Sequence, residues 1–150
     1  MSETISVRPI EPADYYKQYL QLLQMLTSLN PRQISESAFQ HFVNNLNTSH
    51  QIWVIEEQTT NKIIGTITIL IEQKIIHNFG KVCHIEDVVI DKTYRGLGLG
   101  KLLVDKAIDL AEENKCYKTI LDCDQHNEGF YERCGFHKKC SQMTLYHVII

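Results

Sequence analysis

The stretch of sequence that decides the fold runs from position 88 to position 101 and reads Val88-Val89-Ile90-Asp91-Lys92-Thr93-Tyr94-Arg95-Gly96-Leu97-Gly98-Leu99-Gly100-Lys101. It begins as a hydrophobic strand, continues as a glycine-rich turn and ends in a segment with helical spacing of apolar residues. Glycines let the backbone approach a ligand closely, and the unpaired N–H groups at a helix start favour anions. Because Arg95 and Lys101 add positive charge, the stretch predicts a site for a phosphorylated ligand.

Two nucleotide-binding motifs do not fit this turn. A Walker A loop aligned on Gly100 and Lys101 requires glycine where Arg95 stands and serine or threonine where Leu102 stands. A dinucleotide-binding fingerprint that starts at Gly96 requires glycine at position 101 and meets Lys101. A glycine-rich turn without a ligand and a phosphate loop of another kind are the interpretations that remain.

The segments around the turn predict a mixed α/β domain that spans residues 1–150. Strands are expected at 5–10, 52–55, 63–72, 82–90 and 117–123, with extended structure from Phe136 onward. One helix is expected from Pro12 to the Asn30-Pro31 pair, with Tyr16, Leu20, Leu23 and Leu26 at helical spacing. Another is expected after Ser35, with an apolar face of Ala38, Phe39, Phe42, Val43 and Leu46. Further helices are expected after Gly100, with Leu102, Leu103, Ala107, Leu110 and Ala111 on one face, and at 127–134, capped by Gly135.

Composition excludes several classes of protein. The net charge of −3 over 150 residues argues against a bulk electrostatic nucleic-acid binder. The most apolar stretch, residues 63–71, is too short to span a membrane, and Met1-Ser2-Glu3-Thr4 does not have the pattern of a secretory signal. The cysteines lack C-x-x-C spacing and are odd in number, namely Cys83, Cys116, Cys123, Cys134 and Cys140. Free thiols, no metal site and a cytoplasmic location are therefore expected.

The hexapeptide Arg95-Gly96-Leu97-Gly98-Leu99-Gly100 matches the pyrophosphate loop of the GNAT N-acetyltransferases, in which arginine or glutamine is followed by x-x-G-x and glycine or alanine. Four further blocks resemble the glucosamine 6-phosphate N-acetyltransferase branch of this superfamily, at 74–77, 80–87, 116–123 and 127–136. The resemblance implies the GNAT fold, in which a mixed sheet is flanked by helices and a splayed central strand leads into the loop. It also implies a homodimer that transfers acetyl from acetyl-CoA, without a metal, to an amino sugar phosphate. Acetylation of another amine, such as a polyamine or a protein N-terminus, and a non-catalytic acyl-CoA-binding module remain as alternatives.

The resemblance assigns catalytic roles to Glu86, Asp122 and Tyr131. Glu86 orients the amine or accepts its proton through water. The Tyr131 hydroxyl points at the sulfur of CoA, where the pKa of a phenol is close enough to that of an alkyl thiol for it to protonate the leaving thiolate. Asp87 and Asp122 hold the amine or the sugar. Because neighbouring strand residues face opposite sides of a sheet, Glu86 and Asp87 are expected not to share one role.

The resemblance also assigns binding residues. Acetyl-CoA is expected to contact Val88, Val89, Ile90, Arg95, Gly96, Leu97, Gly98, Leu99, Gly100, Lys101, Asn127, Tyr131 and Arg133, with the Val88 N–H as an oxyanion donor. The sugar phosphate is expected to contact Thr27, Lys74, Ile75, Ile76, His77, Glu86, Asp87 and Asp122.

Two further expectations concern the cysteines and the C-terminus. The superfamily transfers acetyl directly in a ternary complex, so Cys123 and Cys134 are expected to be core residues and not nucleophiles. Relatives usually carry an arginine three positions after the residue matching Met143, where this chain has Tyr146. The apolar tail Val148-Ile149-Ile150 is expected to belong to a C-terminal strand that packs on a second subunit.

Overall fold

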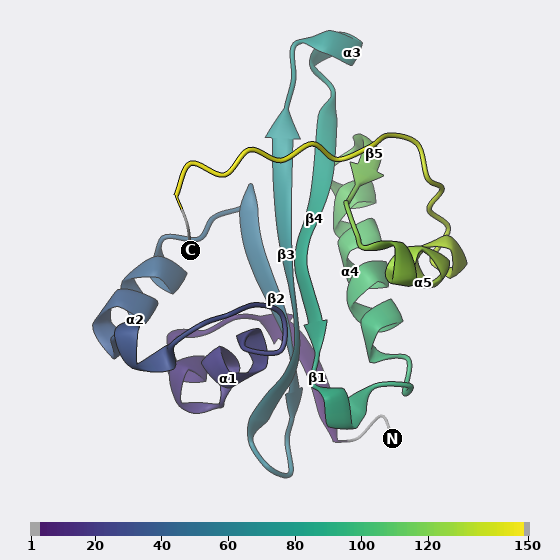
Figure 1. Cartoon of the computed structure of the whole chain (residues 1–150). Coiled ribbons are helices and arrows are strands. Elements are labelled where there is room, and N and C mark those ends of the chain that lie inside the picture. The colour runs from purple at the N-terminus through teal and green to yellow at the C-terminus, as the bar shows by residue number, and fades with distance from the viewer. Residues whose placement is uncertain (1–3, 149–150) are drawn as a thin grey trace.

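A mixed sheet is the framework of the structure, a computed structural model that describes residues 4–148 (Figure 1). The strands are β1 (Ile5–Pro9), β2 (His50–Glu57), β3 (Lys62–Gln73), β4 (Lys81–Ile90) and β5 (Cys116–Ile120). They lie in the order β1-β2-β3-β4-β5, with β1 to β4 antiparallel and β5 parallel to β4. The predictions made for Met1–Glu3 and for Ile149 and Ile150 fall outside the described residues.

Helices cover both faces of this sheet (Figure 1). The α-helices are α1 (Tyr19–Leu23), α2 (Glu36–Asn44), α3 (Ile76–Phe79), α4 (Leu99–Glu113) and α5 (Glu128–Arg133). The 3-10 helices are η1 (Pro12–Tyr16), η2 (Pro31–Gln33), η3 (Lys92–Tyr94) and η4 (Gln125–Asn127). One core, here called the α4 core, joins α4 to the sheet, and a second, the α1 core, joins α1 and α2 to the opposite face.

The central strand β3 is apolar because both of its faces are covered. Residues 63–69 are all buried, with Ile64 and Ile67 in the α4 core and Ile63 in the α1 core. Burial of each such side chain stabilises the fold by about 1.5–3 kcal/mol. Burial of both faces of β3 thus explains why residues 63–69 form a largely apolar run without charged side chains.

The predicted first helix is split in two, so that prediction was wrong. Gln18 adopts a left-handed conformation with φ of 62°, which ends η1 and restarts the chain as α1. The helical spacing therefore does not continue across the break: Leu20 is buried, whereas Tyr16 is 69% exposed and Leu26 is 42% exposed. Leu26 instead reaches the functional site described below.

The other predicted helices form, with differences at their surfaces. Ser35 caps α2 by accepting a hydrogen bond from the Ala38 N–H at 3.2 Å. Of the predicted apolar face, Phe39 and Val43 are buried but Phe42 is half exposed. Gly135 follows α5 with φ of 97°, as expected for a helix end. From Phe136 to residue 148, the last described position, the backbone forms no strand, so the prediction of a final strand was wrong for these residues of the single chain.

Candidate active site

An irregularity at Asp87 in β4 shapes the site. Thr68 pairs with Glu86 and Thr66 pairs with Val89, so β4 has one residue more than β3 over this interval. Asp87 has φ of 50°, a left-handed value that residues other than glycine rarely adopt. This β-bulge shifts the alternation of side chains. Ile85 consequently lies in the α4 core, whereas Val89, four residues later, lies in the α1 core on the other face.

Glu86 and Asp87 line one cavity of about 250 Å³. Both residues reach this cavity although neighbouring strand residues ordinarily point to opposite faces, and the bulge at Asp87 interrupts the regular alternation there. Asp122 and Asp124, which follow β5, bring the number of carboxylates in the lining to four. The lining consists of Leu26, Ile85, Glu86, Asp87, Val88, Asp122, Cys123, Asp124, Asn127, Tyr131 and Gln142. Among these described residues there is no lysine, arginine or histidine, so the cavity attracts cations.

The electrostatics of the cavity act on Glu86. Burial raises the pKa of Glu86 above its ordinary value, and the carboxylates of Asp122 and Asp87 raise that pKa further. A carboxylate with a raised pKa accepts a proton more readily than an ordinary surface carboxylate does. The cavity can therefore bind a cationic amine and take a proton from it.

Strands β4 and β5 separate beside this cavity. Their last pair in the parallel register joins His84 to Ile120, so in the described chain β4 continues from Ile85 to Ile90 without β5 beside it. This matches the predicted splayed strand. Val88 lies on this open stretch and lines the cavity, which is compatible with its predicted role as a backbone donor. Val89 is buried, and the carbonyl of Ile90 accepts a hydrogen bond from Arg95 Nε at 3.2 Å.

Tyr131 of α5 lines the same cavity from the β5 side. Its ring contacts Phe130 and Phe136 edge to face, with centroids 4.9 Å and 6.1 Å away. Burial raises the pKa of Tyr131 to about 12, and the nearby Cys123, Cys134 and Asp122 contribute. The phenol therefore keeps its proton at neutral pH and can donate a hydrogen bond to an anion.

The glycine turn places the start of α4 at the end of the open strand. Gly96 and Gly98 have φ of 80° and 78°, values that cost an L-residue about 1–2 kcal/mol. Gly98 is the N-cap of α4 and supplies no side-chain cap, so the first N–H groups of the helix are available to an anion. Gly100 is needed for packing, because a Cβ there would lie 3.1 Å from the Phe130 ring.

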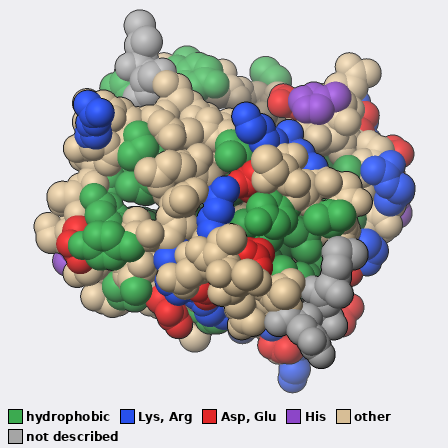
Figure 2. Space-filling view, turned by 90° about the horizontal axis from the view of Figure 1, so that it is seen from below, with side chains coloured by type: hydrophobic (Ala, Val, Ile, Leu, Met, Phe, Trp, Pro, Cys, Tyr) green, Lys and Arg blue, Asp and Glu red, His purple; other side chains and the backbone are tan. Residues whose placement is uncertain are grey.

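Of the three predicted phosphate-binding cations, Arg95 and Lys101 belong to the turn and to the first turn of α4, and Arg133 belongs to α5. Arg95 is exposed, Lys101 pairs with Asp105 at 2.5 Å, and Arg133 lies exposed on α5. Figure 2, which looks at the end of the molecule where β4 meets α4, shows Lys and Arg side chains interspersed with acidic and hydrophobic ones. Positive charge is therefore local and does not form a continuous basic surface on this face.

Comparison with known proteins decides the family. Residues 16–136 match the model of the acetyltransferase (GNAT) family. The chain belongs to the GNAT acetyltransferase family. The mixed sheet with its splayed strand β4, followed by the glycine turn and α4, thus agrees with the fold that the resemblance to this family predicted.

Relatives of known name extend over nearly the whole chain. The glucosamine 6-phosphate N-acetyltransferase of Arabidopsis thaliana is 40% identical over 149 residues, which cover 97% of this chain and 99% of the relative. That of Candida albicans is 37% identical over 86% of this chain and 87% of the relative. The crystal structure of the Arabidopsis thaliana enzyme superposes with a TM-score of 0.92 at 38% identity, covering 97% of this chain and 99% of that one. An acetyltransferase of Trypanosoma brucei superposes with a TM-score of 0.88 at 33% identity, covering 95% and 99%.

The predicted sugar-phosphate residues on the β3–β4 hairpin lie away from this GNAT cavity. Residues 74–77 belong to the tip of the hairpin, which projects beyond the rest of the sheet (Figure 1). Ile75 and Ile76 are 82% and 61% exposed, Lys74 pairs with Glu72 at 3.1 Å, and the His77 ring contacts Tyr117 at 4.3 Å. None of the four lines the cavity, so one chain does not bring them to Glu86.

Other residues of the GNAT site differ from prediction. Thr27 follows Leu26 but only Leu26 lines the cavity, whereas Asn127 lines it as predicted. Cys123 was expected in the core and is exposed instead, because it follows the end of β5 and lines the cavity. Burial and three neighbouring carboxylates raise the pKa of its thiol, which disfavours a nucleophilic thiolate. Cys134 is half-buried and packs against the α4 core.

Gln142 is a residue of the cavity that the sequence did not predict. This residue lies beyond α5, in a segment without helix or strand, and its side-chain amide donates a hydrogen bond to Asp122 at 2.7 Å. Glutamine has no charge and belongs to no motif here, so only its position within the extended segment predicted from Phe136 onward could have marked it.

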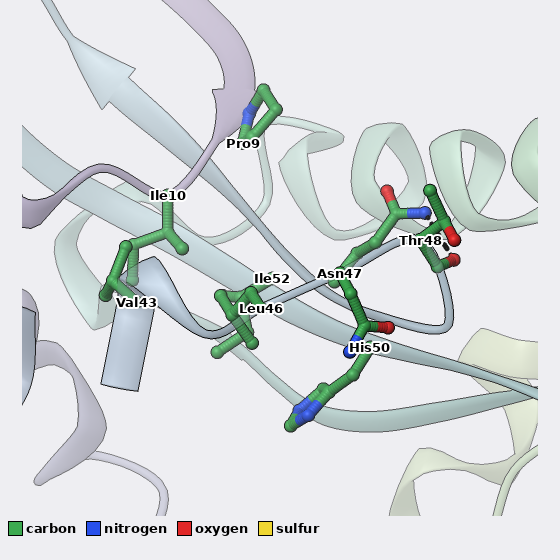
Figure 3. A pocket seen from close by; sticks show the side chains of 9 residues that line it. Pro9, Ile10, Val43, Leu46, Asn47, Thr48, His50 and Ile52 are labelled. Carbon is green, nitrogen blue, oxygen red and sulfur yellow. Dashed lines mark hydrogen bonds between the residues drawn. The ribbon is translucent and has the colours of Figure 1, made fainter. Parts of the chain in front are cut away.

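A second cavity of about 350 Å³ lies between α2 and the strands β1 and β2 (Figure 3). Its lining is Pro9, Ile10, Val43, Leu46, Asn47, Thr48, His50, Gln51 and Ile52. It contains none of the predicted site residues and only one titratable side chain, His50, among the residues described there.

Residues 4–148 offer neither a metal-binding cluster nor a membrane-spanning helix. This part of the chain holds no group of three or more His, Cys, Asp or Glu side chains placed to bind a metal ion. It also has no helix with the length and apolar character needed to cross a membrane.

Proposed function

We propose that this chain transfers acetyl from acetyl-CoA to the 2-amine of glucosamine 6-phosphate, which gives N-acetylglucosamine 6-phosphate and CoA. The observation that carries the proposal is the 40% identity with the Arabidopsis thaliana glucosamine 6-phosphate N-acetyltransferase over nearly the full length of both chains. A cavity with four carboxylates beside an open strand edge supports it, because this chemistry suits an ammonium acceptor next to a bound acyl group.

The acceptor amine arrives as an ammonium ion and must lose a proton before it can attack. Asp87 and Asp122 attract the ammonium and hydrogen-bond to the sugar. Glu86 accepts the proton directly or through water, and its raised pKa suits this role. The site is thus divided into two carboxylates that bind and one that accepts a proton.

At the other end of the site, residues of the chain fit a nucleotide thioester. Gly96, Gly98 and the first N–H groups of α4 form a cradle for a pyrophosphate, with Arg95, Lys101 and Arg133 as nearby cations. Leu97, Leu99, Gly100 and the backbone of Val88 to Ile90 complete the predicted binding set. Acetyl-CoA supplies an activated acyl group, and the Val88 N–H stabilises negative charge on the reacting carbonyl oxygen.

Tyr131 and Asn127 act where the thiolate leaves. Tyr131 donates a hydrogen bond to the departing sulfur, and Asn127 binds the pantetheine arm. Because the pKa of Tyr131 is about 12, its phenol stabilises the thiolate chiefly by hydrogen bonding. Full proton transfer from it is less favourable than the ordinary phenol pKa would allow.

The proposed active form is a homodimer in the cytoplasm. Met143, Leu145, Tyr146 and Val148 are 91%, 79%, 77% and 66% exposed in the single chain, so packing on a second subunit would remove apolar surface from water. A second subunit also offers a way to bring a hairpin tip with Lys74 and His77, and the hydroxyl of Tyr146, to the sugar phosphate.

A panel of amines tests the proposal, with thiol release from acetyl-CoA as the signal. Glucosamine 6-phosphate is expected to be the preferred acceptor over a polyamine and an N-terminal peptide amine. If the polyamine or the peptide amine is acetylated and glucosamine 6-phosphate is not, the proposed substrate is wrong and that amine takes its place. Tight acetyl-CoA binding without turnover of any amine would identify a non-catalytic acyl-CoA-binding module.

A further inference from the structure

The segment that follows α5, residues 136–146 and here called the strap, leaves the helix and crosses in front of β4 and β3 (Figure 1). It contains no helix or strand. Beyond Phe136, two side-chain hydrogen bonds hold it to α5 and to the end of β5. Lys138 Nζ donates to Glu128 Oε1 at 2.8 Å, and Gln142 Nε2 donates to Asp122 Oδ2 at 2.7 Å.

The second of these contacts lies inside the acceptor cavity. Gln142 and Asn127 are the side chains with N–H donors among the described lining residues, which otherwise offer four carboxylates. Gln142 uses its donor on one oxygen of Asp122, and a carboxylate can accept further hydrogen bonds on its other oxygen. Asp122 is exposed, so without this contact its side chain would be free to change rotamer.

We propose that Gln142 is a positioning residue for the acceptor, which holds Asp122 by Oδ2 and leaves Oδ1 to accept a hydrogen bond from the amine or the sugar. This inference deepens the proposed function and rests on it. It also connects the strap, and the exposed tail beyond it, to the acceptor end of the site.

A neutral amide suits this position for an electrostatic reason. A lysine or arginine would neutralise Asp122 and compete with the incoming ammonium for the same carboxylate. A glutamate would add a fifth negative charge and could not donate a hydrogen bond to Asp122. Glutamine orients the carboxylate and leaves its charge available to the substrate.

The test is the steady-state kinetics of Gln142→Ala in the full-length enzyme. We expect the KM for the acceptor amine to rise about tenfold, equivalent to about 1.4 kcal/mol. The kcat is expected to stay within about twofold, and the KM for acetyl-CoA is expected not to change. An acceptor KM that is unchanged or lower would overturn the inference, and a lower value would show that Gln142 competes with the amine.

Lys138→Ala is the matched control, because it releases the strap from Glu128 without touching the cavity. It is expected to leave the acceptor KM unchanged. If both variants raise it equally, the strap as a whole matters and Gln142 has no specific role. Gln142→Ala is also expected to have no further effect in an Asp122→Ala background, which removes the acceptor oxygen, whereas additive effects would contradict coupling between the two side chains.

An NMR measurement is independent of turnover. The side-chain amide protons of Gln142 are expected to shift when Asp122 is replaced by alanine, and a spectrum in which they stay in place would refute the contact. A wild-type enzyme that acetylates a different amine would overturn the proposed function but not this inference. The KM of Gln142→Ala and the KM of the wild type would then be compared with that amine as the acceptor.

Discussion

Tyr131→Phe removes one oxygen from the site where the thiolate is expected to leave. The ring contacts with Phe130 and Phe136 remain, and no hydrogen bond within the described chain uses the Tyr131 hydroxyl. The free energy of unfolding should therefore change by less than about 0.5 kcal/mol. A hydrogen bond to a charged group contributes about 1.5–3 kcal/mol, so loss of one made in the transition state should lower kcat about 10- to 150-fold.

The assay follows thiol release at saturating concentrations of both substrates, with acetyl-CoA affinity measured separately by calorimetry. The affinity is expected to stay within about twofold, because the hydroxyl acts on the leaving sulfur and not on the bound thioester. Tyr117→Phe is the control, since Tyr117 lies on β5 against His77 and does not line the cavity. If Tyr131→Phe turns over as fast as the wild type, the hydroxyl has no role in departure of the thiolate.

Three further predictions concern other parts of the site. The pKa of Glu86 is raised, so wild-type kcat/KM should fall as the pH drops through that pKa and Glu86 takes up a proton. Glu86→Gln should lack this decrease at acidic pH and be about 100-fold slower at neutral pH. A ratio of wild-type to variant kcat/KM that is constant with pH would assign Glu86 to positioning. Gly98→Ala should cost about 1–2 kcal/mol because of the φ of 78°, seen as a lower melting temperature and weaker acetyl-CoA binding in calorimetry; unchanged values would show that the turn does not need a left-handed residue. Removal of residues 143–150 should convert a dimer to a monomer in analytical ultracentrifugation, and a truncated chain that remains dimeric would place the interface elsewhere.

The sequence predicted the parts of the fold in which local pattern and burial agree. Residues 63–72 and 82–90 form strands, and the helix predicted after Gly100 forms and begins at Leu99, directly after the glycine turn. Each of these segments has a strong hydrophobic period or a glycine with a defined conformational need. Tertiary contacts did not have to override local preference in them.

The differences arise where a single residue adopts an unusual backbone conformation. Gln18 at φ of 62° divides the first helix, and Asp87 at φ of 50° interrupts the alternation of β4 where Glu86 and Asp87 line one cavity. Neither glutamine nor aspartate carries a strong signal for these conformations, since both occur far more often with negative φ. The contact of Gln142 with Asp122 joins residues 20 positions apart, and no local period encodes such a pairing.

The most direct test of the central claim is the specificity constant kcat/KM for glucosamine 6-phosphate, compared with glucosamine and with spermidine under identical acetyl-CoA concentrations. The expected result is the highest value for glucosamine 6-phosphate, with one thiol released for each N-acetylglucosamine 6-phosphate formed. A higher value for spermidine, or thiol release without N-acetylated sugar phosphate, would contradict it.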